Sequence, residues 1–475
     1  MTWPNDTCPV HWISARRKLL STLQALKDIF GGANVSTDAS DLQAYGLDWT
    51  RFFEPNPLAI VFAENTDQLV ALTKLARTEK IGLVPSGGRT GLSAGACATH
   101  GEIVVSFDKM NRVVGFNEAE ANVTVEPGLV TAALQQFAEE QNLFYPVDFA
   151  SSGASQIGGN IATNAGGIRV IRYGMTRAQI LGLKVVTGSG EILDLNKGLL
   201  KNNTGYDLRH LFIGSEGTLG FITEATIQLQ EPPLPSKVIL LAISSMTDCL
   251  SILTTFRSRV ALSAFEFFSD LALGHVIDHS ELQRPFEIGS PFYVLIECDD
   301  TKDESYLSAF EACVANGWVT DGIVASSGQQ AQELWQYRER ISESITPRTP
   351  YKNDIAVTVS QVPAFLSDID QLVQARYPEF EIVWFGHIGD GNVHLNILKP
   401  EDWETDRFKS ECETVSEELL GLVEKFGGSI SAEHGVGLLK KNHLGFSRTE
   451  PEIAALRAIK RVFDPDGVMN PGKLI

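Results

Sequence analysis

Three glycine-rich stretches constrain the fold of this chain more than any other feature. They are PSGGRTGLSAGA (85–96), SSGASQIGGNIATNAGG (151–167) and GSEGTLG (214–220), and the first follows the apolar run IGLV. Glycine permits positive φ angles and close approach of the backbone to a ligand, and successive backbone N–H groups in such loops bind phosphate oxygens. One such loop could be a tight turn, but three indicate a cradle for a phosphate-bearing cofactor.

The common nucleotide-binding motifs are absent. No GxGxxG follows the first predicted strand, and GxxxxGK[ST] does not occur in the sequence. The chain therefore matches neither the Rossmann fingerprint nor the P-loop.

The overall composition limits the cellular compartments and binding partners that we expect for this protein. The formal net charge of −20 disfavours nucleic acid and anionic membranes as partners. No apolar run reaches the roughly 18 residues of a membrane-spanning helix, so we expect no membrane span. The six cysteines are scattered without a CxxC pair, as is usual in a reducing compartment. These features predict a cytoplasmic protein.

The order of predicted elements indicates an α+β protein of several domains. Strand, helix and strand alternate over residues 57–88, and the proline-rich QEPPLPS (230–236) is the clearest boundary signal. We expect an N-terminal helical segment, a glycine-rich cofactor-binding domain, a substrate domain of antiparallel sheet and helices, and a C-terminal segment, at 1–50, 51–232, 233–435 and 436–475.

A second feature is the histidine-containing stretch WFGHIGDGNVHLNI (384–397). His387 and His394 flank a Gly-Asp-Gly turn, and SAEHGVG downstream contains Glu433 and His434. A hairpin would place the two imidazoles on neighbouring strands, and two imidazoles with a carboxylate are typical ligands of catalytic zinc. The spacing alone favours paired core histidines over a metal site.

Together these motifs resemble a known superfamily. The three glycine loops and the C-terminal NPGK (470–473) are similar to the vanillyl-alcohol oxidase/p-cresol methylhydroxylase flavoproteins. HIGDGNVHLN and SAEHGVG resemble the branch that oxidises D-2-hydroxy acids, and especially its D-2-hydroxyglutarate dehydrogenase group. The resemblance extends from about residue 40 to the end. It implies a two-subdomain FAD-binding domain, an antiparallel-sheet α+β cap domain for the substrate, and a C-terminal helical segment that returns to the FAD domain.

The resemblance also implies the residues that hold FAD. The first loop would bind the pyrophosphate, and the second and third would line the rest of the cofactor. FAD can be attached covalently to a histidine or a cysteine in some members of this superfamily. Here FAD is expected to be non-covalent, because the first loop contains neither residue before Cys97 and residues 101–209 contain no histidine. The cofactor-binding residues that we expect are Pro85, Ser86, Gly87, Gly88, Arg89, Thr90, Gly91, Ser152, Gly158, Gly159, Asn160, Thr163, Gly166, Gly167, Glu216, Gly220, Ile222 and Asn470.

For the histidine cluster the resemblance implies a divalent metal, with Zn²⁺ the expected ion. His387, His394 and Glu433 would be its ligands. A metal that chelates the hydroxyl and carboxylate of a 2-hydroxy acid lowers the hydroxyl pKa. His434 would then accept the proton while a hydride passes to flavin N5. Asn396 would hydrogen-bond the substrate carboxylate or a ligand.

The substrate's far end is expected at YRERISES (337–344) and PYKND (350–354). On the single helix predicted over 329–345, Arg338 and Ser342 share a face, and Lys352 enters the following strand. These groups suit a second carboxylate, which favours D-2-hydroxyglutarate. Ser342 stands where that group usually has threonine, which keeps D-malate open, and D-lactate and glycolate remain alternatives. A salt-bridged surface helix would explain the same residues without a substrate.

Two alternative functions of other kinds also remain. A metal-dependent hydrolase would use the same histidines, but it leaves the glycine loops unexplained. A non-catalytic FAD-binding scaffold is the other. For the dehydrogenase, we expect a small 2-hydroxy dicarboxylate as substrate and an electron-transfer flavoprotein or a quinone as electron acceptor, and a homodimer is compatible with the sequence.

Overall fold

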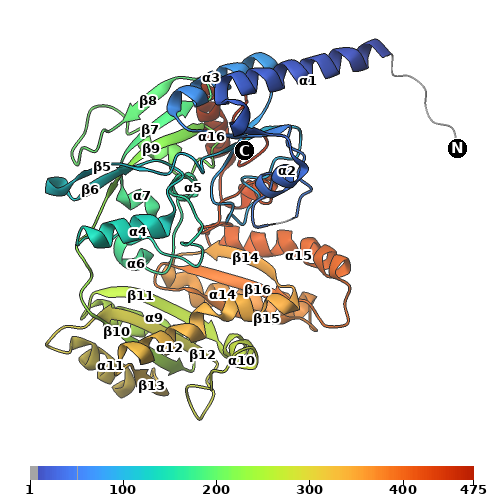
Figure 1. Cartoon of the computed structure of the whole chain (residues 1–475). Coiled ribbons are helices and arrows are strands. Elements are labelled where there is room, and N and C mark those ends of the chain that lie inside the picture. The colour runs from blue at the N-terminus through green and yellow to red at the C-terminus, as the bar shows by residue number, and fades with distance from the viewer. Residues whose placement is uncertain (1–8, 51) are drawn as a thin grey trace.

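The structure is a computed structural model that describes residues 9–50 and 52–475. Helices and three β-sheets alternate through this part of the chain, so the α+β prediction is confirmed (Figure 1). Helix α1 (Pro9–Phe30) begins within the segment predicted to be helical. Residues 1–8 and 51, which belong to the predicted N-terminal segment and cofactor-binding domain, lie outside the described residues.

The first sheet has the order β1-β2-β4-β3 and carries the first glycine loop at its edge. Its strands are β1 (Val35–Ser36), β2 (Ala59–Phe62), β3 (Leu83–Ser86) and β4 (Ile103–Ser106), of which β2, β4 and β3 are parallel. Helix α3 (Thr66–Glu79) connects β2 to β3, and the side chain of Asn65 caps it by accepting the Gln68 N–H. The loop therefore leaves the carboxyl end of a buried strand.

The second sheet is antiparallel, with the order β5-β6-β9-β7-β8. Its strands are β5 (Val113–Asn117), β6 (Asn122–Val125), β7 (Ile180–Thr187), β8 (Ile192–Leu195) and β9 (Gly220–Gln228). Helices α4 (Thr131–Glu140) and α5 (Ile157–Thr163) contribute to its apolar core, and α5 contains part of the second glycine loop. The remaining short helices between β1 and β9 are α2 (Ala39–Tyr45), α6 (Val170–Tyr173), α7 (Thr176–Gln179) and α8 (Arg209–Phe212).

The third sheet forms the lower half of Figure 1 and is antiparallel throughout, with the order β13-β10-β12-β11-β15-β16-β14. Its strands are β10 (Ser236–Ile243), β11 (Leu262–Ser269), β12 (Phe292–Asp299), β13 (Asp321–Val324), β14 (Tyr351–Ala356), β15 (Glu381–His387) and β16 (Asn392–Leu398).

Helices cover both faces of the third sheet. One core packs under α9 (Met246–Arg257), α11 (Ser305–Ala315), α14 (Val362–Arg376) and α15 (Thr405–Lys425). The other packs under α10 (Asp270–Asp278), α12 (Gly328–Glu339) and α13 (Ile341–Ser344). The single helix predicted over 329–345 is thus divided after Glu339 into α12 and α13.

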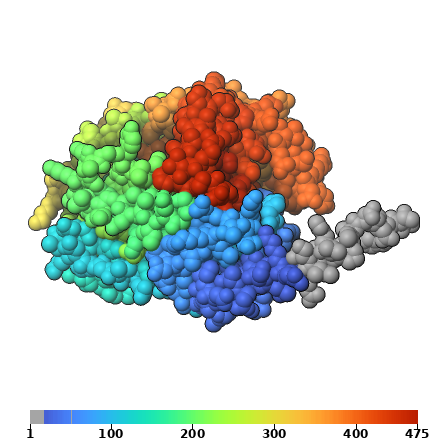
Figure 2. Space-filling view, turned by 90° about the horizontal axis from the view of Figure 1, so that it is seen from above, coloured from blue at the N-terminus to red at the C-terminus, as the bar shows by residue number. Residues whose placement is uncertain are grey.

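The last residues of the chain return to the first sheet. After α16 (Glu450–Phe463), Leu83 at the start of β3 donates its N–H to Val468 O at 2.7 Å and accepts the Asn470 N–H at 2.8 Å. Figure 2 shows this red segment between the orange part of the cap domain and the green and blue parts of the molecule. The C-terminal segment thus contacts the first sheet, while the predicted domain division stays a prediction.

Two further observations complete the fold. Short 3₁₀ helices occur at Gly32–Asn34, Glu118–Glu120, Thr346–Arg348, Val359–Gln361 and Lys441–Phe446. Within the part of the chain that the structure describes, every helix is too short or too polar to cross a membrane.

Candidate active site

The β15–β16 hairpin brings the two predicted histidine ligands together. His394 lies opposite Phe385 and His387 lies opposite Asn392, so the two imidazoles are diagonal neighbours on one face of the sheet. Their ring centroids are 5.4 Å apart and the rings are nearly perpendicular, at 82°. Strand alternation explains the motif, because Val393, Leu395 and Ile397 point into the apolar core on the opposite face.

The turn that follows α15 adds the predicted carboxylate. Glu433 Oε1 lies 4.0 Å from His387 Nε2, 3.9 Å from His394 Nε2 and 3.8 Å from His434 Nε2. These distances are too long for hydrogen bonds, so three imidazole nitrogens surround one carboxylate oxygen without bonding to it directly. His434 Nε2 is as close to Glu433 Oε1 as the two predicted ligands are. The His434 ring is nearly parallel to the His394 ring, and the two ring centroids are 6.2 Å apart.

Glu266 on β11 is a site residue that the sequence analysis missed. Its carboxylate accepts a hydrogen bond from His387 Nδ1 at 2.9 Å and forms an ion pair with Arg338 at 2.9 Å. This bond leaves His387 Nε2 directed at Glu433, as in metal sites where a carboxylate orients a histidine ligand. Burial alone would lower the pKa of His387, but the carboxylates of Glu266 and Glu433 raise it to about 9. The available signal was a single charge in the apolar strand SAFEFF.

Asp354 on β14 is the second missed residue. It is 3% exposed, and its Oδ2 accepts the backbone N–H groups of Glu433 at 3.0 Å and His434 at 3.1 Å. It also lies 3.8 Å from His394 Nδ1 and 3.6 Å from His434 Nδ1. Burial would raise the pKa of Asp354, but the surrounding positive groups, His434 foremost, and these N–H donors hold it well below its usual value.

The protonation state of His394 is set by its burial. Desolvation lowers the pKa of this imidazole well below 6.5, although Asp354 opposes the effect. A neutral imidazole is the form that binds a metal ion. His394 is therefore suited to a ligand role at neutral pH.

The residues expected to bind the far end of the substrate lie on the same face of the third sheet. Lys352 Nζ donates to Ser342 Oγ at 3.0 Å, and Lys352 lies opposite Asn396 in the β14–β16 pair. The Asn396 side chain is 1% exposed and donates to the carbonyls of Val383 and His394 at 3.3 Å. Ser342 and Lys352 are thus brought together beside the histidine cluster.

Arg338 takes a different position from the one expected. Its guanidinium pairs with Glu266 and lies 4.8 Å from the ring centre of Phe385. Because α12 ends at Glu339, Arg338 and Ser342 belong to different helices, and only Ser342 contacts Lys352. Arg338 Nε is buried without a hydrogen-bond partner among the described residues, which leaves a donor for a ligand.

The first two glycine loops lie against each other, and Gly87 and Gly159 leave room for a ligand between them. A Cβ on Gly87 would lie 3.8 Å from Gly159 Cα, and a Cβ on Gly159 would meet no atom within 4 Å. Gly88 packs directly against the carbonyl oxygen of Ala154. Gln156, which the sequence analysis did not single out, lines this space. These contacts are compatible with the cradle predicted from the glycine pattern.

Unpaired polar atoms gather in this cradle. Ser86 Oγ, Gln156 Oε1 and Asn470 Oδ1 are buried and have no hydrogen-bond partner among the described residues. Buried polar groups are normally paired, so these atoms fit a polar ligand such as FAD. Asn470 also ties the C-terminal segment to the cradle, because its Nδ2 donates to Gly95 O at 2.9 Å.

The remaining cofactor candidates have local structural roles that do not exclude a ligand. Asn160 donates to Thr131 Oγ1, Thr163 to Gly159 O and Ser152 to Asp148 Oδ1, and Arg89 donates to Gly87 O. Gly158 packs on Pro127, and Gly91 faces Asp48. Gly220 and Ile222 lie within β9. The rest of the expected set occupies the same two loops, at Pro85, Thr90 and Gly167.

The end of the second glycine loop touches the histidine cluster. A Cβ on Gly166 would lie 3.1 Å from Glu433 Oε2, so the cofactor cradle and the predicted metal site share a border. Asparagine and glycine residues after α5 thus connect two sites that are about 270 residues apart in the sequence. This contact places the predicted cofactor cradle next to the predicted metal site.

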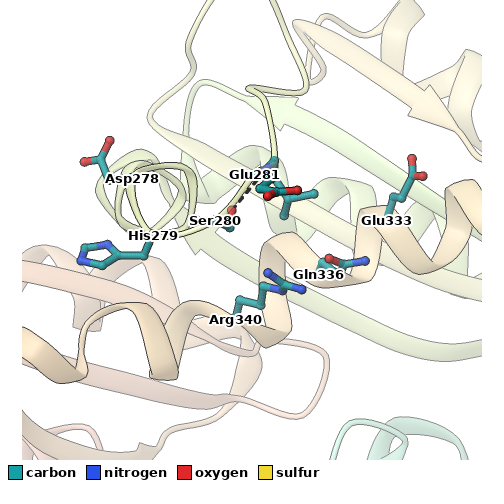
Figure 3. A pocket seen from close by; sticks show the side chains of 8 residues that line it. Asp278, His279, Ser280, Glu281, Glu333, Gln336 and Arg340 are labelled. Atoms are coloured by element: carbon teal, nitrogen blue, oxygen red, sulfur yellow. Dashed lines mark hydrogen bonds between the residues drawn. The ribbon is translucent and has the colours of Figure 1, made fainter.

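A separate cavity of about 860 Å³ lies between the end of α10 and α12 (Figure 3). Glu333 and Gln336 of α12 and Arg340 directly after it line the cavity, and His279 lines it from the opposite side. Arg338 is two residues from Arg340 and points to the other side of the helix, toward Glu266. None of the predicted site residues lines this cavity.

Two family descriptions match the sequence. "FAD binding domain" matches residues 57–196, and "FAD linked oxidases, C-terminal domain" matches residues 233–474. The chain belongs to the FAD-linked oxidases. FAD is therefore the cofactor of this oxidase, and the match favours an oxidoreductase over the hydrolase alternative.

Proteins of similar sequence align with this oxidase over almost its whole length. A protein of Stutzerimonas stutzeri (strain A1501) named D-2-hydroxyglutarate dehydrogenase is 54% identical over 455 residues, which are 95% of this chain and 98% of the relative. A protein of the same name from Xanthomonas citri pv. viticola is 48% identical and covers 96% of both chains. The solved structure of p-cresol methylhydroxylase with substrate bound aligns over 97% of both chains, with a TM-score of 0.75 and 15% identity. The predicted superfamily, fold class and resemblance to the D-2-hydroxyglutarate dehydrogenase group are confirmed.

Proposed function

We propose that this FAD-linked oxidase oxidises D-2-hydroxyglutarate to 2-oxoglutarate. The contact between Gly166 of the cofactor cradle and Glu433 of the histidine cluster carries the proposal, because it joins a flavin site to groups that can hold a 2-hydroxy acid. The names of the relatives at 54% and 48% identity support this substrate. FAD would supply the acceptor for the hydride from C2.

The side chains around Glu433 fit a divalent metal, and Zn²⁺ is the ion that we propose. His387, His394 and Glu433 offer two imidazole nitrogens and a carboxylate oxygen within 4.8 Å of one another. Glu266 fixes the orientation of His387, and burial keeps His394 neutral. Bound there, the ion would lower the pKa of the substrate hydroxyl.

His434 is our proposed general base. Its Nδ1 lies 3.6 Å from the buried carboxylate of Asp354, which stabilises the imidazolium formed when His434 Nε2 accepts the hydroxyl proton. Asp354 also holds the His434 backbone N–H at 3.1 Å, so the same carboxylate orients the base. The Asp354, Glu433 and His434 side chains form a second candidate ligand set, which makes a metal test at both sets necessary.

The second carboxylate of the substrate would bind at Lys352 and Ser342, with the free Nε of Arg338 as a further donor. These residues face the same side of the sheet as Asn396 and the histidines. D-lactate and glycolate lack this second carboxylate and do not need the Lys352 ammonium. D-malate has a second carboxylate on a shorter carbon chain and is therefore the alternative substrate.

Anaerobic flavin reduction tests the proposed reaction. We expect D-2-hydroxyglutarate to bleach the visible flavin band, and D-lactate and D-malate to do so far more slowly at equal concentration. Faster bleaching by D-lactate would make the Lys352 cluster structural. His434→Ala should retain FAD and lose at least about 100-fold in the rate of reduction, since general-base catalysis typically contributes 10²–10⁴-fold; an unchanged rate would remove His434 as the base.

Metal removal provides a test that does not depend on turnover alone. Dialysis against a chelator should remove bound zinc, leave the FAD absorbance unchanged and suppress oxidation, and added Zn²⁺ should restore both metal content and rate. His387→Ala should lower the zinc content of the protein as purified. Full activity of a metal-free protein would reject the metal site.

Several wider properties remain part of the proposal. We propose non-covalent FAD, because the cradle side chains of the first two glycine loops contain no histidine. A cytoplasmic location is supported by the described cysteines, which are all unpaired and buried. An electron-transfer flavoprotein or a quinone would accept the electrons, and a homodimer is testable by light scattering.

A further inference from the structure

The turn that contains Glu433 and His434 is held from two sides by buried carboxylates. Asp354 of the cap sheet accepts the backbone N–H groups of Glu433 and His434. Glu216 of the third glycine loop accepts those of Val436 at 2.8 Å and Gly437 at 2.7 Å. Asp354 lies on β14 of the third sheet and Glu216 lies in the loop before β9 of the second sheet, so the turn is fixed to both halves of the molecule.

Both oxygens of Glu216 are used in this contact. Its side chain is buried at 8% exposure, with Oε1 bonded to Val436 and Oε2 to Gly437. Gly435 has a φ of +83°, and a Cβ there would lie 3.1 Å from Glu216 Cδ. The glycine therefore allows the turn to approach the carboxylate closely, at a φ that favours glycine.

Lys440 lies at the end of the same turn. Its Nζ donates to Ile430 O at 2.8 Å, and its backbone N–H bonds to Val436 O, which closes the turn. Burial lowers the pKa of the Lys440 ammonium, and the carboxylates of Asp354 and Glu216 oppose that effect. Two buried carboxylates with one nearby ammonium are less costly than the same acids without a counter-charge.

We propose that Glu216 is a positioning residue of the active-site turn and does not bind FAD through its carboxylate. Glu216 and Asp354 hold Glu433 and His434 at a fixed distance from the cofactor cradle. The effect that we expect on the reaction rests on the proposed function. It changes the sequence-based expectation that Glu216 is a cofactor residue.

Glu216→Gln is the direct test. A glutamine has the same size, but its amide nitrogen must face one of the two backbone N–H groups, so one bond and the charge are lost. We expect hydrogen exchange of the Val436 and Gly437 amides to accelerate at least tenfold, with exchange in the third sheet unchanged. The FAD content per chain should equal that of the wild type, and kcat should fall more than the KM for D-2-hydroxyglutarate rises.

Asp464 offers a matched control. It is also buried, accepts two backbone N–H groups, from Val468 at 3.0 Å and Met469 at 2.9 Å, and has Lys460 as its counter-charge. Asp464→Asn should accelerate exchange of the Val468 and Met469 amides and leave residues 433–437 protected. Acceleration of the 433–437 turn by both variants would indicate global loosening and overturn the proposal.

Two further results separate the possible failures. Lys440→Met keeps both acids, and we expect it to accelerate exchange of the whole 433–437 turn even if Glu216→Gln does not fold. A loss of FAD from Glu216→Gln with unchanged exchange of the turn would identify Glu216 as a cofactor ligand and overturn the proposal. If the wild-type protein does not oxidise D-2-hydroxyglutarate, the proposed function fails, while the exchange measurements still decide whether the two carboxylates hold the turn.

Discussion

Lys352 combines two properties that are uncommon together at the scale of a single residue. Its side chain is accessible to solvent, yet the surrounding protein desolvates its ammonium enough to lower its pKa below 10.5. A lysine in a concave part of the surface has both properties, and its ammonium donates a hydrogen bond to the Ser342 hydroxyl. Such an ammonium is suited to an anionic group of a ligand.

Lys352→Met should change substrate preference. Removal of a charge-assisted contact to the second carboxylate costs about 1.5–3 kcal/mol, so the KM for D-2-hydroxyglutarate should rise about 10- to 150-fold. The KM for D-lactate should stay within about twofold. Lys425→Met removes a lysine on α15 that pairs with Asp368 and serves as the charge-matched control. An equal loss for both substrates would assign Lys352 a structural role.

The same residue predicts a pH dependence. The protonated ammonium binds the carboxylate, so diacid binding is complete below the pKa of Lys352 and is lost as the pH rises through it. Because desolvation lowers this pKa, kcat/KM for D-2-hydroxyglutarate should begin to fall at a pH below 10.5. A pH profile for D-lactate, or for Lys352→Met with either substrate, should lack that step.

At the scale of the element, the β15–β16 hairpin positions the histidines through its backbone pairing. Gly386 lies opposite Val393, and a Cβ on Gly386 would lie 2.5 Å from Asn392 O. A side chain at this position would force the strands apart next to His387. The glycine is thus required by strand packing and not by a positive φ.

Gly386→Ala should therefore separate metal binding from FAD binding. We expect a loss of about 1–3 kcal/mol in unfolding free energy, as is usual for overpacking, and a reduced zinc content with normal flavin absorbance. Gly421→Ala is the control, because Gly421 lies in helix α15 and a Cβ there meets no atom within 4 Å. It should be neutral or stabilising by up to about 1 kcal/mol. Normal zinc binding by Gly386→Ala would contradict this account of the hairpin.

At the scale of the whole molecule, α6 joins the FAD-binding half to the cap sheet. Arg172 on this helix forms an ion pair with Asp299 of β12 and donates to Ser263 Oγ of β11 at 3.1 Å. Ile171 beside it packs against the core of the cap domain. These contacts hold the cradle against the histidine cluster, because the second glycine loop ends at Gly167, directly before α6.

Arg172→Met should weaken that junction. The lost charged hydrogen bonds are each worth about 1.5–3 kcal/mol, so urea unfolding followed by tryptophan fluorescence should show reduced stability, and kcat should fall with FAD still bound. Arg376→Met removes an exposed ion pair with Glu418 on the outer helices and should cost at most about 1 kcal/mol with normal kcat. Equal effects of the two variants on kcat would show that the junction does not position the site.

Parts of the site could be predicted because their signals are local. The glycine loops need only the conformational freedom of their own backbone, and the alternation of His394 and Asn396 with Val393 and Leu395 follows from the period of a strand. The helix over 329–345 was predicted less well. Its apolar spacing continues through α13, so the division after Glu339 that separates Arg338 from Ser342 has no clear local signal.

The sequence by itself determined the α+β class, and it predicted the FAD cradle and the residue types at the candidate metal site, because short-range patterns specify turns and strand faces. Only the tertiary structure decided which charges support them. Glu266 is 121 residues from His387, Asp354 is 79 from Glu433, and Glu216 is 220 from Val436. Such pairs depend on sheet order and on burial, which make an unpaired charge costly, and neither is visible in the local sequence.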